Sequence, residues 1–266
     1  MYSFRQRISV NPLQGRIIQT PKVQRMNRAN CGDDQVVMFR KKELRGSRVR
    51  CLMLTSIPRH QVASILTRLI EPIGSVNSNS DKWAPGGFLN PEEPKLGENQ
   101  LFLPLQQREA VTDWWLKVRR NANTPNWDLV STCNIDGKGG LILIEAKAHS
   151  NELKSAGKQK NNPDNDDQIG RAIYEANSAL NRILPGWALT KSSHYQLCNR
   201  FAWSWKLATM GVPVVLIYLG FLCCDEMSDC GLPFNSAEKW ERAIRPVRRC
   251  LQSVPQAYLR LLIGQP

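Results

Sequence analysis

The clearest pattern in the chain is a predicted strand that changes character along its length. Residues 141–144 are four consecutive aliphatic residues, and residues 145–149 continue the run as Glu-Ala-Lys-Ala-His. Side chains of a strand alternate between its two faces. One face then carries Leu141, Leu143, Glu145, Lys147 and His149. The other face is entirely apolar. A face that turns from aliphatic to charged is poorly suited to a core, and it predicts a polar site at the edge or fork of a sheet.

A second strand is predicted immediately before this one. Residues Trp127–Ile135 are rich in apolar and β-branched side chains, and the Asp136-Gly137 pair that follows is typical of a tight hairpin turn. The two strands should therefore pair antiparallel, with Asp128 at the head of the first. Asp136 is an alternative first carboxylate, but its Asp-Gly setting favours a turn residue.

Helical spacing is found on both sides of the hairpin. We predict helices from Pro104 to about Arg120, from Asp166 onward after a polar loop, and over about 194–210. The buried stripe of the first is expected to be Ala110, Val111, Trp114, Trp115 and Val118. Val212–Leu222 is apolar almost throughout and predicts a buried strand, parallel to the charged one through a right-handed crossover.

The first hundred residues differ from the rest in charge and in pattern. Residues 1–80 hold 14 Lys and Arg against 4 Asp and Glu, whereas residues 81–266 hold 22 against 19. The net charge of +13 is therefore mostly N-terminal. Apart from a short helix at His60–Ile70, sustained periodicity is lacking. We predict a basic, mostly irregular extension at residues 1–100 and an α/β domain at residues 101–266.

The basic extension leaves three interpretations open. It could follow nucleic-acid phosphates, act as an organellar transit segment, or add little to the fold. The eight cysteines include no C-x-x-C pair, which argues against a zinc ribbon or a disulfide framework. No apolar stretch reaches the length of a membrane span, and the N-terminus lacks the apolar region of a secretory signal. We therefore expect a cytoplasmic protein without a membrane partner, with organellar import as the alternative.

The charged face of the strand has the composition of a metal site. Asp128 and Glu145, if they lie on neighbouring strands, repel each other unless a divalent cation lies between them. Hard oxygen ligands with retained waters and phosphate oxygens are the pattern of Mg²⁺. Such an ion acidifies a bound water, and Lys147 could hydrogen-bond that water or a scissile phosphate. The alternative is an exposed ion pair between Glu145 and Lys147, with Asp128 as a turn or capping residue.

An Asp on one strand of a hairpin, followed by Glu145-Ala146-Lys147 on the next, resembles the PD-(D/E)XK nuclease superfamily. The resemblance covers roughly Leu103 to Leu222. It departs from the pattern at Trp127, where the pattern has a proline that many members lack. It implies a restriction-endonuclease-like, three-layer α/β core with a mixed sheet, in which helices flank a catalytic hairpin. It also implies hydrolysis of phosphodiester bonds with Mg²⁺ or Mn²⁺.

The same resemblance assigns roles to the residues of the motif. Asp128 and Glu145 would bind the metal, the carbonyl oxygen of Ala146 would add a ligand, and Lys147 would be the catalytic lysine. Nucleic acid is the implied partner, with DNA expected first and RNA left open. The oligomeric state stays open, a dimer included. The alternative function is a catalytically silent module on the same fold, which binds nucleic acid or protein without turnover.

Three further residues are candidates because of their positions. Glu109, on the helix before the hairpin, is the candidate for an extra metal ligand, although helical spacing turns it away from the centre of the buried stripe. His149, on the charged face of the strand, is a candidate substrate contact. Gln168 is either a substrate contact or an ordinary residue of a first helical turn.

Overall fold

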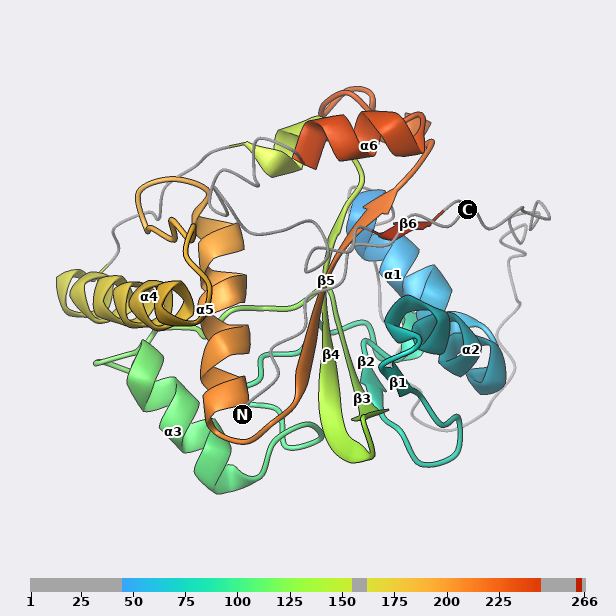
Figure 1. Ribbon diagram of the computed structural model, residues 1–266. Helices are drawn as coiled ribbons and strands as arrows, with labels where there is room; N and C mark the ends of the chain where they lie inside the picture. The colour runs from blue at the N-terminus through green and yellow to red at the C-terminus, as the bar shows by residue number, and fades with distance from the viewer. Residues whose placement is uncertain (1–44, 155–161, 245–261, 265–266) are drawn as a thin grey trace, which may run out of the picture.

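The structure, a computed structural model, describes residues 45–154, 162–244 and 262–264. Its centre is a six-stranded mixed sheet in the order β1-β3-β4-β5-β6, with β2 also paired to β3 (Figure 1). The strands are β1 (Gly74–Ser75), β2 (Trp83–Ala84), β3 (Leu129–Ile135), β4 (Lys138–Lys147), β5 (Val214–Phe221) and β6 (Leu262–Gly264).

The β3–β4 hairpin and its parallel neighbour β5 are confirmed. Leu129 pairs with Ile144 in the antiparallel ladder, and Asp136 and Gly137 form the turn with φ of 47° and 81°. Two positive φ angles in a two-residue loop match the right-handed twist of the strands that it joins. Strand β5 runs parallel to β4 and places Tyr218 beside Glu145.

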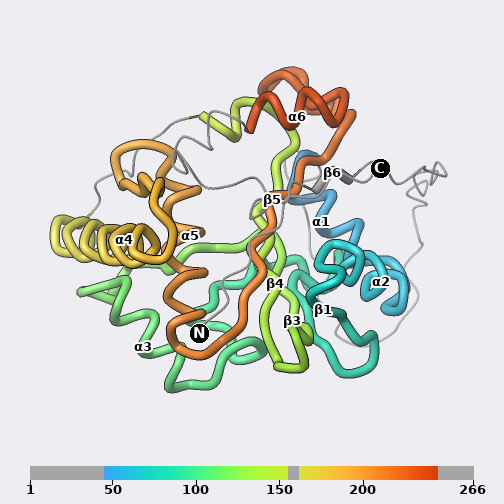
Figure 2. The backbone as a smooth tube through the Cα atoms, in the orientation of Figure 1, coloured from blue at the N-terminus to red at the C-terminus, as the bar shows by residue number. Residues whose placement is uncertain are grey.

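Helices cover both faces of the sheet (Figures 1 and 2). On one side lie α1 (Gly46–Ser56) and α2 (Arg59–Ile70). On the other lie α3 (Leu105–Trp115), α4 (Pro163–Ile183) and α5 (Tyr195–Thr209). The short helix α6 (Ala237–Ile244) lies over the end of β5, where the ring of Trp240 fills the space that a side chain at Gly220 would need. The short 3₁₀ segments are η2 (Gly87–Leu89), η3 (Ser150–Leu153) and η4 (Asp225–Met227).

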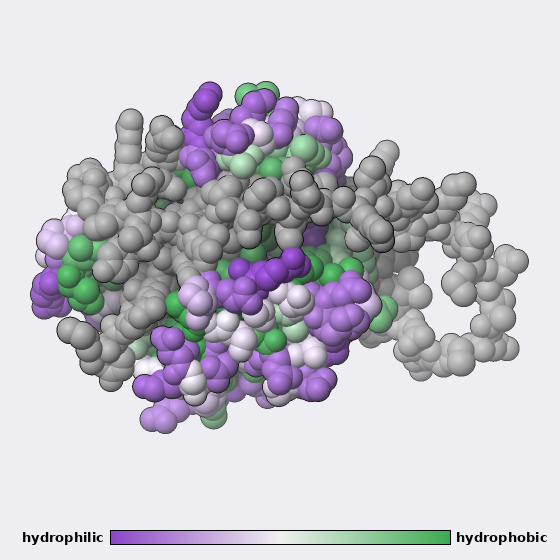
Figure 3. Space-filling model, turned by 45° about the vertical axis from the view of Figure 1, so that its right-hand side comes forward, coloured by the Kyte–Doolittle hydropathy of each residue, from purple (hydrophilic) through white to green (hydrophobic). Residues whose placement is uncertain are grey.

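The two faces of the sheet bury two separate hydrophobic cores. Toward α3, α4 and α5 the core includes Leu141, Leu143, Leu216, Ile169, Ala172, Phe201 and Trp203. Toward α1 and α2 it includes Ile142, Ile144, Ile217, Val62, Leu66 and Ile70. The predicted alternation of side chains along β4 therefore separates the residues that enter one core from those that enter the other. Among the coloured residues in the view of Figure 3, hydrophilic residues predominate, with smaller hydrophobic areas between them.

The prediction that residues 1–100 are mostly irregular is wrong for residues 45–100. The predicted helix at His60–Ile70 is present as α2, but α1 precedes it and both pack on the sheet. The apolar stripe of α1 is interrupted by arginine, and Arg50 pairs with Glu226 of η4 at 3.1 Å. Glu226 lies far along the chain from Arg50. When the basic segment is considered without this partner, its composition therefore predicts a solvent-exposed segment. Residues 1–44 lie outside the described residues.

Two helix boundaries also differ from prediction. Helix α3 ends at Trp115, well before Arg120, and Ala110 in its expected stripe is exposed. Helix α4 begins at Pro163 because the Asn162 side chain accepts a hydrogen bond from the backbone N–H of Asn165, followed by proline at the first helical position.

The cysteines and the hydropathy of the helices give two further observations on the described residues. None of the six cysteines in the described ranges forms a disulfide with another of them, and Cys51, Cys133, Cys198 and Cys224 are buried. Among the described residues, no helix has both the length and the apolar character needed to cross a membrane.

Candidate active site

Three charged side chains are buried together at the end of β4. Glu145, Lys147 and Arg200 are 1%, 6% and 5% exposed. Lys147 Nζ donates to Glu145 Oε1, and Arg200 Nε donates to Glu145 Oε2 at 2.7 Å. Both oxygens of one carboxylate therefore accept from a cation. The alternative of an exposed ion pair between Glu145 and Lys147 is wrong, because neither side chain is at the surface.

Arg200 reaches this cluster from α5 and is held on every side. Its Nη2 donates to the carbonyl oxygen of Asn126 at 2.5 Å, and its Nη1 donates to Asn199 Oδ1 at 2.8 Å. The guanidinium carbon lies 4.6 Å from the centroid of the Trp127 ring, a cation–π distance. The planar guanidinium thus links α5, the segment before β3 and the end of β4 at one point.

Asp128 lies at the fork where β4 continues past the start of β3. It precedes Leu129 directly, so the antiparallel register extended by one residue sets it opposite Glu145. The residue is half-buried, and its Oδ2 accepts the backbone N–H of Ala146 at 2.7 Å. Burial, and then the charge of Glu145, raise the pKa of Asp128 to about 8, although Lys147 opposes the shift. The two carboxylates are therefore close enough to repel each other.

The two cations, Lys147 and Arg200, both donate hydrogen bonds to Glu145, and this sets Glu145 apart from Asp128. Burial acts to raise the pKa of Glu145, but Arg200 and Lys147 outweigh it and leave that pKa lowered. Burial acts to lower the pKa of Lys147, but Glu145 and Asp128 outweigh it and leave that pKa raised. Glu145 and Lys147 are thus charged at neutral pH, whereas Asp128 lacks a cation of its own.

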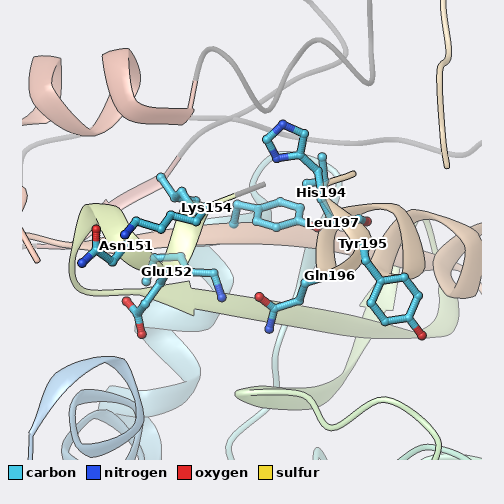
Figure 4. A pocket seen from close by; sticks show the side chains of 10 residues that line it. Asn151, Glu152, Lys154, His194, Tyr195, Gln196 and Leu197 are labelled. Carbon is cyan, nitrogen blue, oxygen red and sulfur yellow. Dashed lines mark hydrogen bonds between the residues drawn. The ribbon is translucent and has the colours of Figure 1, made fainter. Parts of the chain in front are cut away.

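A cavity of about 270 Å³ adjoins the cluster through Lys147 (Figure 4). Its walls come from the end of β4, from η3, from the first turn of α5 and from Tyr218 on β5. Glu152 is the carboxylate among the lining residues, and it is occupied: Oε2 accepts the backbone N–H groups of Ala148 and His149, and Oε1 accepts from Ser47. Lys147 therefore lies between the carboxylate of Glu145 and a cavity that a small chemical group can enter.

The structure does not bring Glu109 to the cluster. Its side chain is exposed on α3, whose buried residues are Val111, Thr112 and Trp115. The helical phase that buries these three turns Glu109 outward. The expected role of Glu109 as a metal ligand is therefore withdrawn.

The two predicted substrate contacts also lie elsewhere. Gln168 Nε2 donates to the carbonyl oxygen of Trp114 at 2.8 Å, and its Oε1 accepts from Arg171, so its amide joins α4 to the end of α3. His149 is buried, with its ring against Gly231 and beside Glu152, and it is not among the residues that line the cavity. Both side chains are used in packing, and neither is retained as a substrate contact.

Arg200 is the site residue that the sequence analysis missed. A usable signal was present, because Arg200 shares a helix face with Leu197, Phe201 and Ser204, all of which are buried. An arginine within an apolar stripe is almost never buried without a partner. The pattern therefore required an acid, without saying which one.

Comparisons with protein-family models, with curated proteins and with solved structures give no match to this chain. What the fold and the site define is a mixed α/β protein with a buried glutamate, lysine and arginine, and a half-buried aspartate, at the end of a central strand. Any narrower description depends on the chemistry of those side chains.

The residues of the fork fit a divalent cation through oxygen ligands. No group of three or more His, Cys, Asp and Glu able to hold a metal occurs within the described residues, so the acidic ligands would be Asp128 and Glu145 alone. Magnesium is commonly bound through one or two carboxylates, with water and substrate phosphate as the remaining ligands. Burial and then the charge of Glu145 raise the pKa of Asp128, and a cation beside this carboxyl group would act in the opposite direction. The carbonyl oxygen of Ala146 is the further candidate ligand.

Proposed function

We propose that this chain is a nuclease that hydrolyses phosphodiester bonds, most readily in DNA, with Mg²⁺ or Mn²⁺. The observation that carries the proposal is the burial of Glu145 and Lys147 at the end of an otherwise aliphatic strand, with the half-buried Asp128 opposite Glu145 and a cavity beside Lys147. Burying charged groups costs hydration energy, and apolar side chains of similar size often stabilise a fold as well or better. The cluster is therefore better explained by chemistry than by stability.

The order of the residues supports the same class of protein. An acid before β3, then Glu-x-Lys at the end of β4, is the arrangement of the PD-(D/E)XK superfamily that the chain resembles. In the proposed site, Asp128 and Glu145 hold the metal ion. When bound, the ion acidifies a water molecule and neutralises charge on the phosphate.

Lys147 and Arg200 have different parts in this proposal. The Lys147 ammonium stays charged beside Glu145 and faces the cavity, where it hydrogen-bonds the attacking water or the scissile phosphate. Arg200 touches no substrate and instead holds the Glu145 carboxylate in one orientation, through contacts that Asn126 and Trp127 fix in turn. Such preorganisation lowers the cost of reaching the reactive geometry.

One observation favours a second function. Lys147 and Arg200 already bond both oxygens of Glu145, so this acid is neutralised within the protein itself. A site of that kind is stable without a metal ion and could serve a module that binds nucleic acid or protein and cleaves nothing.

Cleavage by the purified full-length chain separates the two functions. Plasmid and labelled oligonucleotides are incubated with Mg²⁺ or Mn²⁺, and the rate is compared with that of Asp128→Asn. Asparagine keeps the size of the side chain and can still accept from Ala146, but it removes the carboxylate that a metal ion would bind. We expect cleavage to fall at least about 100-fold.

The matched control is Asp136→Asn. Asp136 is exposed in the hairpin turn at φ 47°, a conformation that asparagine also adopts readily. This variant should cleave at the rate of the unchanged protein. An Asp128→Asn protein that remains fully active would overturn the proposed site. Binding of DNA without cleavage by the unchanged chain would favour the silent module.

A further inference from the structure

The cavity beside Lys147 has an aromatic and aliphatic floor. Tyr218 is buried, its hydroxyl donates to the carbonyl oxygen of Leu197 at 3.4 Å, and its ring stacks on Phe201 with the centroids 6.2 Å apart. Leu153 and Leu197 add apolar surface. A tyrosine ring held in this way supplies fixed surface on which a nucleobase can pack.

The polar groups around the cavity carry an excess of positive charge. Lys147 and Lys154 both line it, whereas the carboxylate of Glu152 is satisfied by two backbone N–H groups and a hydroxyl. Lys154 is exposed and has no carboxylate partner among the described residues. In Figure 4, Gln196 extends from the first turn of α5 toward the side on which Glu152 lies. A phosphate group matches the ammonium groups, and an amide can read a base edge.

The size of the cavity limits what can enter. Its volume of about 270 Å³ is at the lower end of the range for pockets that enclose small ligands, which begins near 300 Å³. One nucleotide can occupy such a space, but a base-paired duplex cannot. A nucleotide within a duplex would first have to leave the stack, at a cost of a few kcal/mol.

We propose that this cavity binds a single unpaired nucleotide, with its phosphate toward Lys147 and Lys154 and its base against Tyr218 and Leu197. The substrate is then a single strand or a frayed end rather than intact duplex. The proposal rests on the nuclease function for its consequence in cleavage, but the binding site itself does not require turnover.

Binding is tested without metal, on the full-length chain in the presence of EDTA. Calorimetric titration compares thymidine 5′-monophosphate, thymidine and inorganic phosphate. We expect the monophosphate to bind at least tenfold more tightly than either of the other two. Equal binding of inorganic phosphate would show a plain anion site, and no binding of the monophosphate would remove the cavity as a nucleotide site.

Two exposed residues make the test local to the cavity. Lys154→Ala and Gln196→Ala should each weaken binding of the monophosphate about fivefold, a typical effect of one exposed polar contact. Lys138→Ala, an exposed lysine at the start of β4 in the hairpin, is the matched control and should leave binding unchanged. Equal effects of Lys154→Ala and Lys138→Ala would show that only general charge is measured.

Cleavage then separates this proposal from the nuclease proposal. A single-stranded oligonucleotide should be cleaved at least tenfold faster than covalently closed duplex. Equal rates on both would overturn the unpaired-nucleotide site and leave the nuclease standing. Nucleotide binding that is sensitive to Lys154→Ala, in a protein that cleaves nothing, would keep the site and overturn the nuclease.

Discussion

The two faces of strand β4 are built from alternate residues of one segment, and they diverge where the strand ends. Toward α1 and α2 the face stays apolar through Ala146 and on to Ala148, and each of these residues is buried. Toward α5 the aliphatic residues give way to Glu145 and Lys147, which are buried to almost the same degree. Burial alone therefore does not distinguish the faces, but the chemistry of the buried groups does.

The difference shows which residues hold the fold and which serve a site. On the α1–α2 face each buried methylene group contributes about 0.8 kcal/mol through the hydrophobic effect. On the α5 face each charged group gives up its hydration, and only pairing with Lys147 and Arg200 compensates Glu145 for that loss. We therefore expect substitutions on the first face to change stability, and substitutions on the second to change chemistry as well.

Removing α1 and α2, which cover the apolar face of the sheet, should have the largest effect on stability. A chain that lacks residues 1–100 loses α1, α2, β1 and β2 and exposes the buried side chains of Ile142, Ile144 and Ile217. We expect it to aggregate and to lose cooperative thermal unfolding, as followed by calorimetry and circular dichroism. A cooperative transition in the shortened chain would instead show that the domain starts near Leu101.

Breaking the charged face should have the next largest effect. Glu145→Gln leaves Lys147 and Arg200 buried without the carboxylate that both bond, and we expect a loss of about 3–5 kcal/mol in the free energy of unfolding. Urea unfolding measures it. The matched control is Glu98→Gln, which removes the exposed partner of Lys95 at 3.5 Å and should cost at most about 1 kcal/mol.

Two results would sharpen or contradict this expectation. Replacing Glu145, Lys147 and Arg200 together by apolar residues of similar size should recover much of the lost stability, because no unpaired charge is left. If Glu145→Gln and Glu98→Gln lose equally little, the buried cluster is open to water and the contrast between the faces fails.

The last expected effect depends on pH and belongs to Asp128. Its pKa in the folded chain is about 8, above the ordinary 3.8, because of burial and the charge of Glu145, with Lys147 opposing. The folded state therefore holds a proton that the unfolded state has released, and this group loses stability as pH rises from about 4 to 8. Glu145, whose pKa is lowered, contributes stability above its unfolded pKa and loses it in acid.

Asp128→Asn removes the pH-dependent contribution of Asp128 to stability and leaves that of Glu145. The melting temperature of the variant minus that of the unchanged chain should therefore rise between pH 5 and 8 and level off above pH 8. Melting curves in metal-free buffer at four pH values measure this difference. A difference that stays constant, or that falls with pH, would show that the Asp128 carboxyl group is not held in its protonated form.

The local elements could largely be predicted from the sequence because their signals are local. The Asp136-Gly137 turn, the alternation along β4 and the parallel strand β5 each follow from short-range patterns of side chains and glycine. Asp128, Glu145 and Lys147 were found for the same reason, since each lies on one of two strands that a tight turn joins.

Prediction from local patterns failed where the polar or charged side chains of a segment pair with residues far along the chain. Helix α1 carries Arg48 and Arg50, which hide its apolar stripe, and the partner of Arg50 is Glu226, 176 residues away. His149 and Gln168 were candidate substrate contacts because of their positions, with an ordinary first-turn residue as the alternative for Gln168. In the structure His149 packs against Gly231, and Gln168 donates to the carbonyl oxygen of Trp114. A polar residue in a sequence does not show which neighbour will satisfy it.

By itself, the sequence determined that two acids and a lysine share a hairpin, because the period of a strand and the geometry of its turn depend on adjacent residues. Only the tertiary structure decided that Arg200, 55 residues from Glu145, completes the cluster, and that α1 and α2 close the opposite face of the sheet. Pairings of this kind depend on how helices pack on the sheet, and no local pattern of residues encodes that packing.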